Sequence, residues 1–185
     1  MGLAAAVKST FWTNYFRMQG RASRSEFWWF ICIFVAGNAA LRMLPFYINM
    51  ADPSGEMWLI SNVALMAFYL YMFPPFVTVL VRRLHDMGKS GWWALWLYVL
   101  IPLLCGGISL LLGLRLPTFG LPAEWIYIGL FAVGALAGSM LSGIIELIIG
   151  FIKPKATDNP YGPPPETAAA AAAEMETAPQ TSKNI

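Results

Sequence analysis

The sequence predicts an all-α membrane protein with four transmembrane helices, an N-terminal interfacial helix and a disordered C-terminal tail. Of its 185 residues, 58% are hydrophobic and 12% are charged, whereas about a quarter of the residues of a soluble domain are charged. The charges are also segregated, because four apolar stretches contain only two charged residues, Arg42 and Glu146. These stretches are 27–48, 57–81, 92–114 and 125–147.

Each apolar stretch has the length of a membrane span. About 20 apolar residues in a helix cross roughly 30 Å of hydrocarbon. Backbone amides in lipid must be hydrogen-bonded within their own segment, so we expect helices rather than strands. The four spans and the segment before them define a transmembrane domain over residues 1–152.

The N-terminal segment, about residues 4–19, is expected to be an interfacial helix. Val7, Phe11 and Tyr15 recur there at helical spacing. Such a helix either lies on the inner leaflet with its aromatic side in the lipid, or packs on the transmembrane bundle. Ser23 and Glu26 then form the pattern of a capping box, which predicts that the first span begins at Arg24.

Polar residues and prolines in the first two spans predict specific features. Asn38 is expected to form a hydrogen bond to another helix, and Arg42 to reach the interface or pair with an acidic residue of the outer loop. The Pro74-Pro75 pair predicts a kink in the second span, because neither residue has an amide N–H. Gly88 is a suitable residue to end the helix that follows this kink.

Small residues distinguish the fourth span. Gly134 and Gly138 are four residues apart, a spacing that allows helix backbones to approach closely. We favour packing within the chain over the alternative, a homo-oligomer formed through these glycines.

Beyond the fourth span the composition changes. Residues 153–185 are rich in proline and alanine and contain little apolar surface. Prolines preclude a continuous helix, and six consecutive alanines are too few to form a stable one. A disordered cytoplasmic tail is therefore expected.

The distribution of basic residues predicts the orientation of the spans. Ten of the 12 Lys and Arg residues lie on one side of the predicted membrane. Because basic residues accumulate in cytoplasmic loops, this side is expected to be cytoplasmic, with both termini on it. The ten residues are Lys8, Arg17, Arg21, Arg24, Arg82, Arg83, Lys89, Lys153, Lys155 and Lys183.

Metal and redox chemistry have little support in the sequence. Cys32 and Cys105 lie inside predicted spans, and His85 is the single histidine. A zinc site needs three or four clustered ligands, so no metal, disulfide or cofactor is expected. No nucleic-acid partner is expected either.

Three motifs resemble a known family. They are Gly-Arg-Ala-Ser-Arg-Ser-Glu-Phe-Trp-Trp at 20–29, Arg-Arg-Leu-His-Asp-Met-Gly-Lys-Ser-Gly-Trp-Trp at 82–93, and Asp-Asn-Pro-Tyr-Gly-Pro-Pro-Pro at 158–165. Together they resemble the domain of unknown function 805 family of small bacterial inner-membrane proteins, over about residues 15–165. The resemblance implies a multi-pass helical protein of the bacterial inner (cytoplasmic) membrane, and it implies no chemistry and no catalytic residues.

The first two motifs contain the candidate site. By topology both lie on the cytoplasmic face, where their cations could contact anionic phospholipid headgroups or a partner. The cations are Arg21, Arg24, Arg82, Arg83 and Lys89. A supporting polar cluster could include Glu26, His85, Asp86 and Glu146.

These polar residues also have a structural interpretation. The cations could serve only to fix topology and to pair with nearby carboxylates, for example Arg82 with Asp86 at the i,i+4 spacing of a helix. The sequence favours this interpretation slightly.

Three classes of function remain open. The first is a membrane interaction or scaffold protein with a basic inner face. The second is a small transporter or channel subunit, which the scarcity of charged residues near the span centres disfavours. The third is an enzyme acting on a lipid phosphate with His85 as base, but Asp86 would point about 100° away on a helix and could not orient it. We expect the first class and no enzyme activity.

Overall fold

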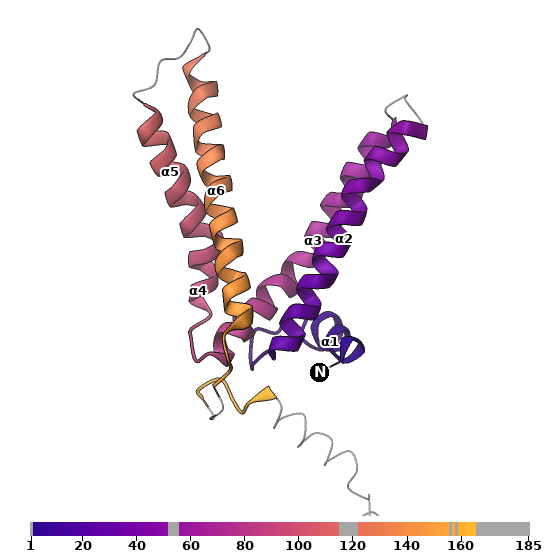
Figure 1. Cartoon of the computed structure of the whole chain (residues 1–185), viewed down its shortest axis with the longest axis vertical. Helices are drawn as coiled ribbons and strands as arrows, with labels where there is room; N and C mark the ends of the chain where they lie inside the picture. Colours follow the sequence, from indigo (N-terminus) through magenta and orange to yellow (C-terminus); the bar gives the residue numbers. More distant parts are fainter. Residues whose placement is uncertain (1, 52–55, 115–121, 156, 158, 166–185) are drawn as a thin grey trace, which may run out of the picture. The chain divides into compact units, whose positions relative to one another are not determined.

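The computed structural model describes residues 2–51, 56–114, 122–155, 157 and 159–165, which are mostly helical (Figure 1). The chain divides into two compact units. The first contains Met1–Gly88 and Lys153–Ile185, and the second contains Lys89–Ile152. Each unit is built around one helical hairpin.

The four predicted spans are confirmed as long apolar helices. Each has the length and hydropathy needed to cross a membrane. The first unit contains α2 (Arg24–Ala51) and α3 (Glu56–Asp86). The second contains a continuous helical run of α4 (Trp92–Leu95), the π-helical segment η2 (Trp96–Leu100) and α5 (Ile101–Gly113), followed by α6 (Ala123–Phe151).

The N-terminal helix is shorter than the sequence predicted. It consists of α1 (Leu3–Lys8) and the π-helical turn η1 (Ser9–Thr13), and it does not continue to residue 19. Asn14 ends it by donating from its backbone N–H to the Ser9 carbonyl (2.8 Å) and from its side-chain amide to the Ser9 hydroxyl (2.9 Å). Asparagine favours such local bonds over continued helix.

The two sides of this N-terminal segment differ: one packs on the hairpin and the other is exposed. Thr10 is buried, and the Phe11 ring lies parallel to Tyr71 of α3 at a centroid distance of 6.1 Å. The opposite side is open, because Trp12 and Phe16 are 74% and 77% exposed. The segment therefore packs on the hairpin and still presents aromatic side chains outward.

Aromatic packing and a close helix contact hold α2 against α3. Phe30 and Phe34 of α2 contact Phe76 of α3, with ring centroids 5.8 and 5.4 Å apart. A Cβ atom added to Gly37 would lie 2.8 Å from the Phe68 ring, so the ring would have to move to admit a larger residue. The N-cap is also as predicted, since the Ser23 hydroxyl accepts from the Glu26 backbone N–H (3.2 Å).

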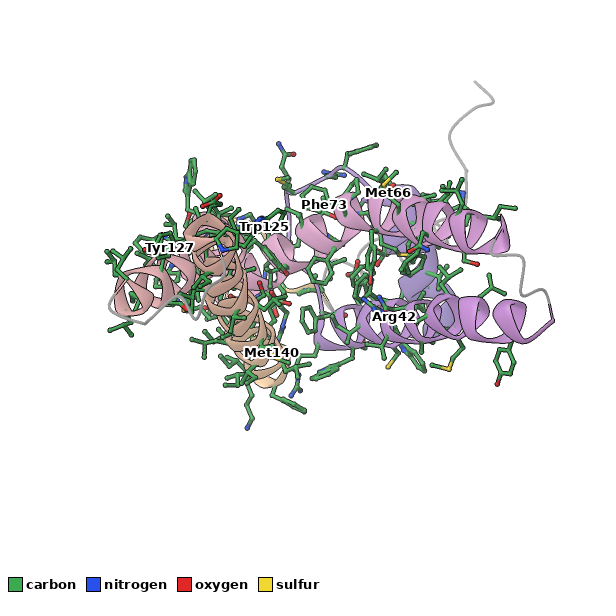
Figure 2. The ribbon with its side chains drawn as sticks, turned by 90° about the horizontal axis from the view of Figure 1, so that it is seen from above. Arg42, Met66, Phe73, Trp125, Tyr127 and Met140 are labelled. Carbon is green, nitrogen blue, oxygen red and sulfur yellow. The ribbon has the colours of Figure 1, made fainter. Side chains whose placement is uncertain are left out.

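A polar triad lies further along the same hairpin. The Asn38 amide donates to the Tyr69 hydroxyl on α3 (2.5 Å), which confirms the predicted interhelical bond. Arg42 donates to the Asn38 side-chain oxygen (3.0 Å) and to Tyr69 (3.1 Å), and Figure 2 shows it beside α2. Figure 2 also labels outward apolar side chains of α3 and α6, including Met66 and Met140, as expected for lipid-facing helices.

Prolines within the spans leave carbonyl groups that other segments satisfy. α3 continues through Pro74 and Pro75, and Pro75 cannot donate to the carbonyl of Tyr71, four residues earlier. The Tyr15 hydroxyl donates to that carbonyl instead (2.7 Å). In the second unit, the π-helical register joins the Ile101 N–H to the Trp96 carbonyl, five residues earlier. In this register Pro102 has no N–H for the Leu97 carbonyl, which accepts from the Ser142 hydroxyl of α6 instead (2.5 Å).

The glycines of the fourth span pack within the chain, the alternative that we favoured. A Cβ atom on Gly134 would lie 2.5 Å from the Cys105 carbonyl oxygen, and one on Gly138 would lie 2.8 Å from Pro102 Cα. Both glycines therefore face α5 of their own hairpin. A homo-oligomer would have to use another face.

Candidate functional site

Five of the predicted charged residues meet at one end of the first unit. This ion-pair cluster lies where α2 begins and α3 ends. Its members are Arg21, Glu26, Arg82, Arg83 and Asp86, and all five are buried. Buried charges are stable only when they are paired and hydrogen-bonded, so their contacts determine what the site can do.

Glu26 joins three segments of the chain. Its Oε1 atom accepts from Arg82 Nη2 of α3 at 2.5 Å. The same oxygen accepts from the Ser9 hydroxyl at 2.8 Å and the Thr10 hydroxyl at 3.5 Å, both in η1. The N-terminal segment is thus bonded to the start of α2 and the end of α3 through one carboxylate.

Asp86 is shared by two guanidinium groups. Its Oδ1 atom accepts from Arg21 Nε at 2.8 Å, and its Oδ2 atom accepts from Arg83 Nη1 at 2.5 Å. Arg82 and Asp86 have the i,i+4 spacing of a helical pair, but Arg83, at i,i+3, binds Asp86, and Arg82 pairs with Glu26. Both spacings bring side chains together on a helix, and the position of Glu26 on α2 decides between them.

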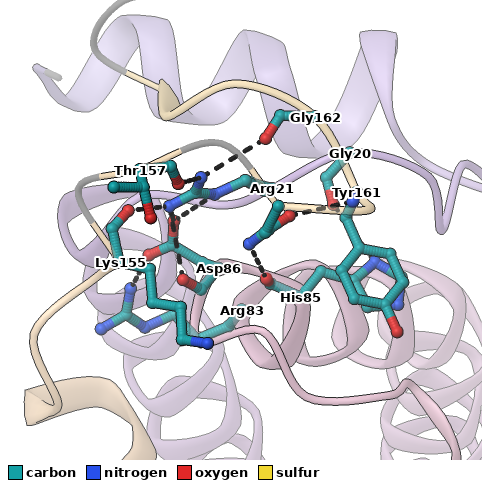
Figure 3. Close-up of polar contacts among 10 residues, drawn as sticks. Gly20, Arg21, Arg83, His85, Asp86, Lys155, Thr157, Tyr161 and Gly162 are labelled. Atoms are coloured by element: carbon teal, nitrogen blue, oxygen red, sulfur yellow. Dashed lines mark hydrogen bonds and ion pairs between the residues drawn. The ribbon is translucent and has the colours of Figure 1, made fainter.

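A segment from beyond α6 covers this cluster. We call residues 155, 157 and 159–162 the strap. Arg21 donates from Nη2 to the Lys155 carbonyl, and from Nη1 to the carbonyls of Thr157 (3.1 Å) and Gly162 (3.4 Å), as Figure 3 shows. The Lys155 backbone N–H in turn donates to the Asp86 carbonyl (3.1 Å).

The strap also contacts the C-terminal end of α3. The Asn159 amide donates to the His85 carbonyl (2.9 Å), which also accepts from the Gly88 backbone N–H (2.8 Å). The Tyr161 ring stacks on the His85 ring at a centroid distance of 3.8 Å and an angle of 2°. The His85 ring also donates from Nδ1 to the Gly20 carbonyl (3.2 Å). Gly88, with φ +72°, ends α3 as predicted.

The strap differs from the expectation of disorder from residue 153 onward. Its turn is built by the Asn-Pro-Tyr-Gly sequence, in which the Asn159 side chain accepts from the Tyr161 backbone N–H (2.9 Å) and Gly162 has φ +113°. Asn, Pro and Gly are typical turn residues, so the sequence carried a signal for local structure here. The rest of the predicted tail, 166–185, lies outside the described residues.

The other predicted site residues have no described contact with the ion-pair cluster's carboxylates. Arg24 is exposed on α2, and Lys89 is exposed in the second unit. Glu146 is buried in the second unit, near Tyr98. Of the five cations predicted to contact headgroups, only Arg24 and Lys89 are therefore accessible as the structure stands.

The cluster is electrostatic in character. Among the described residues, no three His, Cys, Asp or Glu side chains group as metal ligands would, and both cysteines are free thiols. What the arrangement can do is hold guanidinium groups in fixed positions at the depth where the candidate spans begin and end.

Together, the four long apolar helices define a multi-pass α-helical membrane protein, with the ion-pair cluster where α2 begins and α3 ends. The sequence profile of DUF805, described as a protein of unknown function, matches residues 15–163. The chain belongs to this family, and it is an inner-membrane protein.

Three relatives from Escherichia coli (strain K12) illustrate the similarity. Inner membrane protein YhaH is 33% identical over 82 residues, which are 44% of this chain and 64% of YhaH. Inner membrane protein YhaI is 33% identical over 86 residues, 46% of this chain and 65% of YhaI. The uncharacterized protein YiiR is 30% identical over 147 residues, 80% of this chain and 84% of YiiR.

The match to YhaH and YhaI thus spans slightly less than two thirds of either protein. No solved structure matches the chain. The family profile ends at Pro163, so it includes both the ion-pair cluster and the strap.

Proposed function

We propose that this protein is a membrane interaction protein that binds anionic phospholipid headgroups through exposed cations beside its N-terminal segment. The observation that carries the proposal is the outward side of this segment. Trp12 and Phe16 are about three-quarters exposed, although nearby aromatic rings are packed on α3. Exposed aromatic rings favour the interface between hydrocarbon and headgroups.

Exposed cations accompany these rings. Lys8 and Arg17 lie within the same segment, and Arg24 is the first residue of α2. Each cation near an anionic surface contributes about 1 kcal/mol of attraction. Lys89 of the second unit is exposed as well and would add a separate contact of the same kind.

The ion-pair cluster supports this role by positioning the segment. Glu26 binds Ser9 and Thr10 of η1, so the aromatic rings are held at the level where α2 begins. His85 has its Nδ1 on the Gly20 carbonyl and its ring under Tyr161, an environment that suits packing better than acid–base chemistry. We therefore propose a non-enzymatic role.

The proposed contact requires the N-terminal segment on the cytoplasmic side. A reporter fused after Ile185 is expected to be cytoplasmic, and one inserted near Pro53 is expected on the opposite side. The reason is the distribution of basic residues, ten of 12 on one predicted face. Paired alkaline phosphatase and fluorescent-protein fusions measure this, and two reporters on the same side would refute the arrangement.

Headgroup binding is tested by removing two exposed cations. The Arg17→Gln, Arg24→Gln double variant is expected to lose most of the parent protein's preference for phosphatidylglycerol over phosphatidylcholine. Exposed charges are screened over about 8 Å at physiological ionic strength, so the parent's preference should also decrease as salt rises. The measurement is lipid retained per protein after exchange into nanodiscs containing both lipids.

An Arg115→Gln, Lys183→Gln double variant is the matched control, because it lowers the net charge equally at positions outside the proposed contact. It should retain the parent's preference. If both double variants keep the preference, or both lose it, the exposed cations of the N-terminal segment do not form the headgroup contact.

A further inference from the structure

The strap is more exposed than the residues that it covers. None of its residues is buried, whereas Arg21, His85 and Asp86 beneath it are 8%, 8% and 0% exposed. Its described contacts are hydrogen bonds, three of them from the Arg21 guanidinium to strap carbonyls, and a single ring stack. Segments with few buried apolar contacts open locally at low cost in free energy.

Opening the strap would change the surroundings of one group above all. Arg21 donates from Nε to Asp86, a residue of α3 and not of the strap. Its Nη1 atom donates to two strap carbonyls, those of Thr157 and Gly162. When the strap leaves, the N–H groups of Nη1 lose these acceptors and face outward.

A phosphate group is a better acceptor for this edge than peptide carbonyls are. The guanidinium makes its bonds charge-assisted with either acceptor, but only phosphate adds a negative charge on the acceptor and can accept two parallel N–H bonds. The planar fork of arginine also matches two phosphate oxygens at once. The strap carbonyls therefore occupy positions that phosphate oxygens could take.

The depth of Arg21 suits a headgroup ligand. The candidate spans of the first unit begin at Arg24 and end at Asp86, and Arg21 contacts the second of these residues directly. Lipid phosphates lie at the level where transmembrane helices leave the hydrocarbon.

We propose that the strap is a displaceable cover over a phosphate-binding site centred on Arg21, and that the ligand is the phosphate of an anionic lipid. The inference rests on the proposed binding of anionic headgroups and adds a second, covered contact to it. In the closed state the cation pairs with Asp86 and the strap. In the open state the lipid phosphate replaces the strap carbonyls, and Asp86 continues to orient the guanidinium.

Hydrogen exchange of the full chain in nanodiscs tests the cover. A ligand that binds only the open state raises the open population by the factor 1 + [L]/Kd, which is about threefold at twice the dissociation constant. Peptides spanning 155–162 are therefore expected to exchange about threefold faster in phosphatidylglycerol than in phosphatidylcholine, while peptides from α2 and α3 are unchanged. Equal exchange in both lipids overturns the proposal.

A third condition of the same experiment distinguishes the phosphate of a lipid headgroup from free inorganic phosphate. Phosphatidylcholine nanodiscs with added inorganic phosphate should leave strap exchange unchanged if the ligand is a lipid headgroup. Acceleration by inorganic phosphate alone would overturn the assignment to lipid. This readout is independent of the Arg17 and Arg24 variant, so failure of either proposal is seen separately.

Two variants connect the effect to Arg21 and to the strap. Arg21→Lys keeps the charge beside Asp86 but lacks the fork, and is expected to abolish the lipid-dependent acceleration. Asn159→Ala combined with Tyr161→Ala weakens the strap and leaves every arginine in place, so it should retain more phosphatidylglycerol than the parent. Pro163→Ala, at an exposed position just beyond the strap, is its control. Retention at or below the parent's level by the double variant would refute the cover even if Arg21→Lys fails to fold.

Discussion

Replacing Asp86 with asparagine is expected to lower the free energy of unfolding by about 3–5 kcal/mol, the range for breaking a buried ion pair. Asp86 accepts from both Arg21 and Arg83, and the three side chains are 0–1% exposed. Asparagine has nearly the same shape but no charge, so the two buried guanidinium groups would lose the negative charge of Asp86. The measurement is reversible unfolding by SDS in mixed micelles, followed by circular dichroism.

Glu124 provides the matched control. It is a carboxylate in the first turn of α6 and is exposed. Glu124→Gln removes the same charge and should change stability by no more than about 0.5 kcal/mol. Arg83→Ala should likewise lower the free energy of unfolding far more than Arg17→Ala, because Arg17 is exposed. Similar losses for the buried and exposed members of these pairs would mean that the ion-pair cluster contributes little to stability.

The second large effect is expected at Gly134. A methyl group there would lie 2.5 Å from both the Cys105 carbonyl oxygen and Ser109 Cβ. Neither the backbone nor Cβ can turn away as the end of a flexible side chain could, so α5 and α6 must separate. Gly134→Ala is expected to cost about 3 kcal/mol, the upper part of the usual range for overpacking, in the same unfolding assay.

Gly143 lies on the same helix and has nothing within 4 Å of the corresponding Cβ position. Alanine is the better helix former by about 1 kcal/mol, so Gly143→Ala should be neutral or stabilising. If Gly134→Ala lowers the free energy of unfolding and Gly143→Ala raises it, close helix packing is the cause of the lower stability at Gly134. If Gly134→Ala is as stable as Gly143→Ala, the close approach of α5 and α6 is wrong.

The parts of the fold that sequence alone could predict depend on composition and local pattern. Four apolar stretches are enough to identify the four helices, because a bilayer requires both their length and their lack of charge. Ser23 as an N-cap and Gly88 as a helix end follow from the chemistry of a few adjacent residues. Asn38 has an interhelical partner because an amide in an apolar environment needs one.

The parts that could not be predicted depend on contacts between distant segments. Whether Arg82 or Arg83 pairs with Asp86 is decided by the position of Glu26 on another helix, which no helical spacing encodes. The strap was missed for a related reason. Its residues have almost no apolar surface, and what holds them is a buried arginine 134 positions away from the Lys155 carbonyl.

The carbonyls left open by the membrane prolines have a consequence for biogenesis. A backbone carbonyl without a hydrogen-bond donor is unfavourable in lipid. The backbone of each span is therefore fully hydrogen-bonded only when the side chain that donates to this carbonyl is in place. For α3 the donor is Tyr15, which a ribosome synthesises before the prolines that create the need. For the third span the donor is Ser142, 45 residues after Leu97. The first hairpin can thus enter the membrane already complete, whereas the third span must wait for the fourth, and insertion of these last two helices as a pair avoids exposing the open carbonyl to lipid.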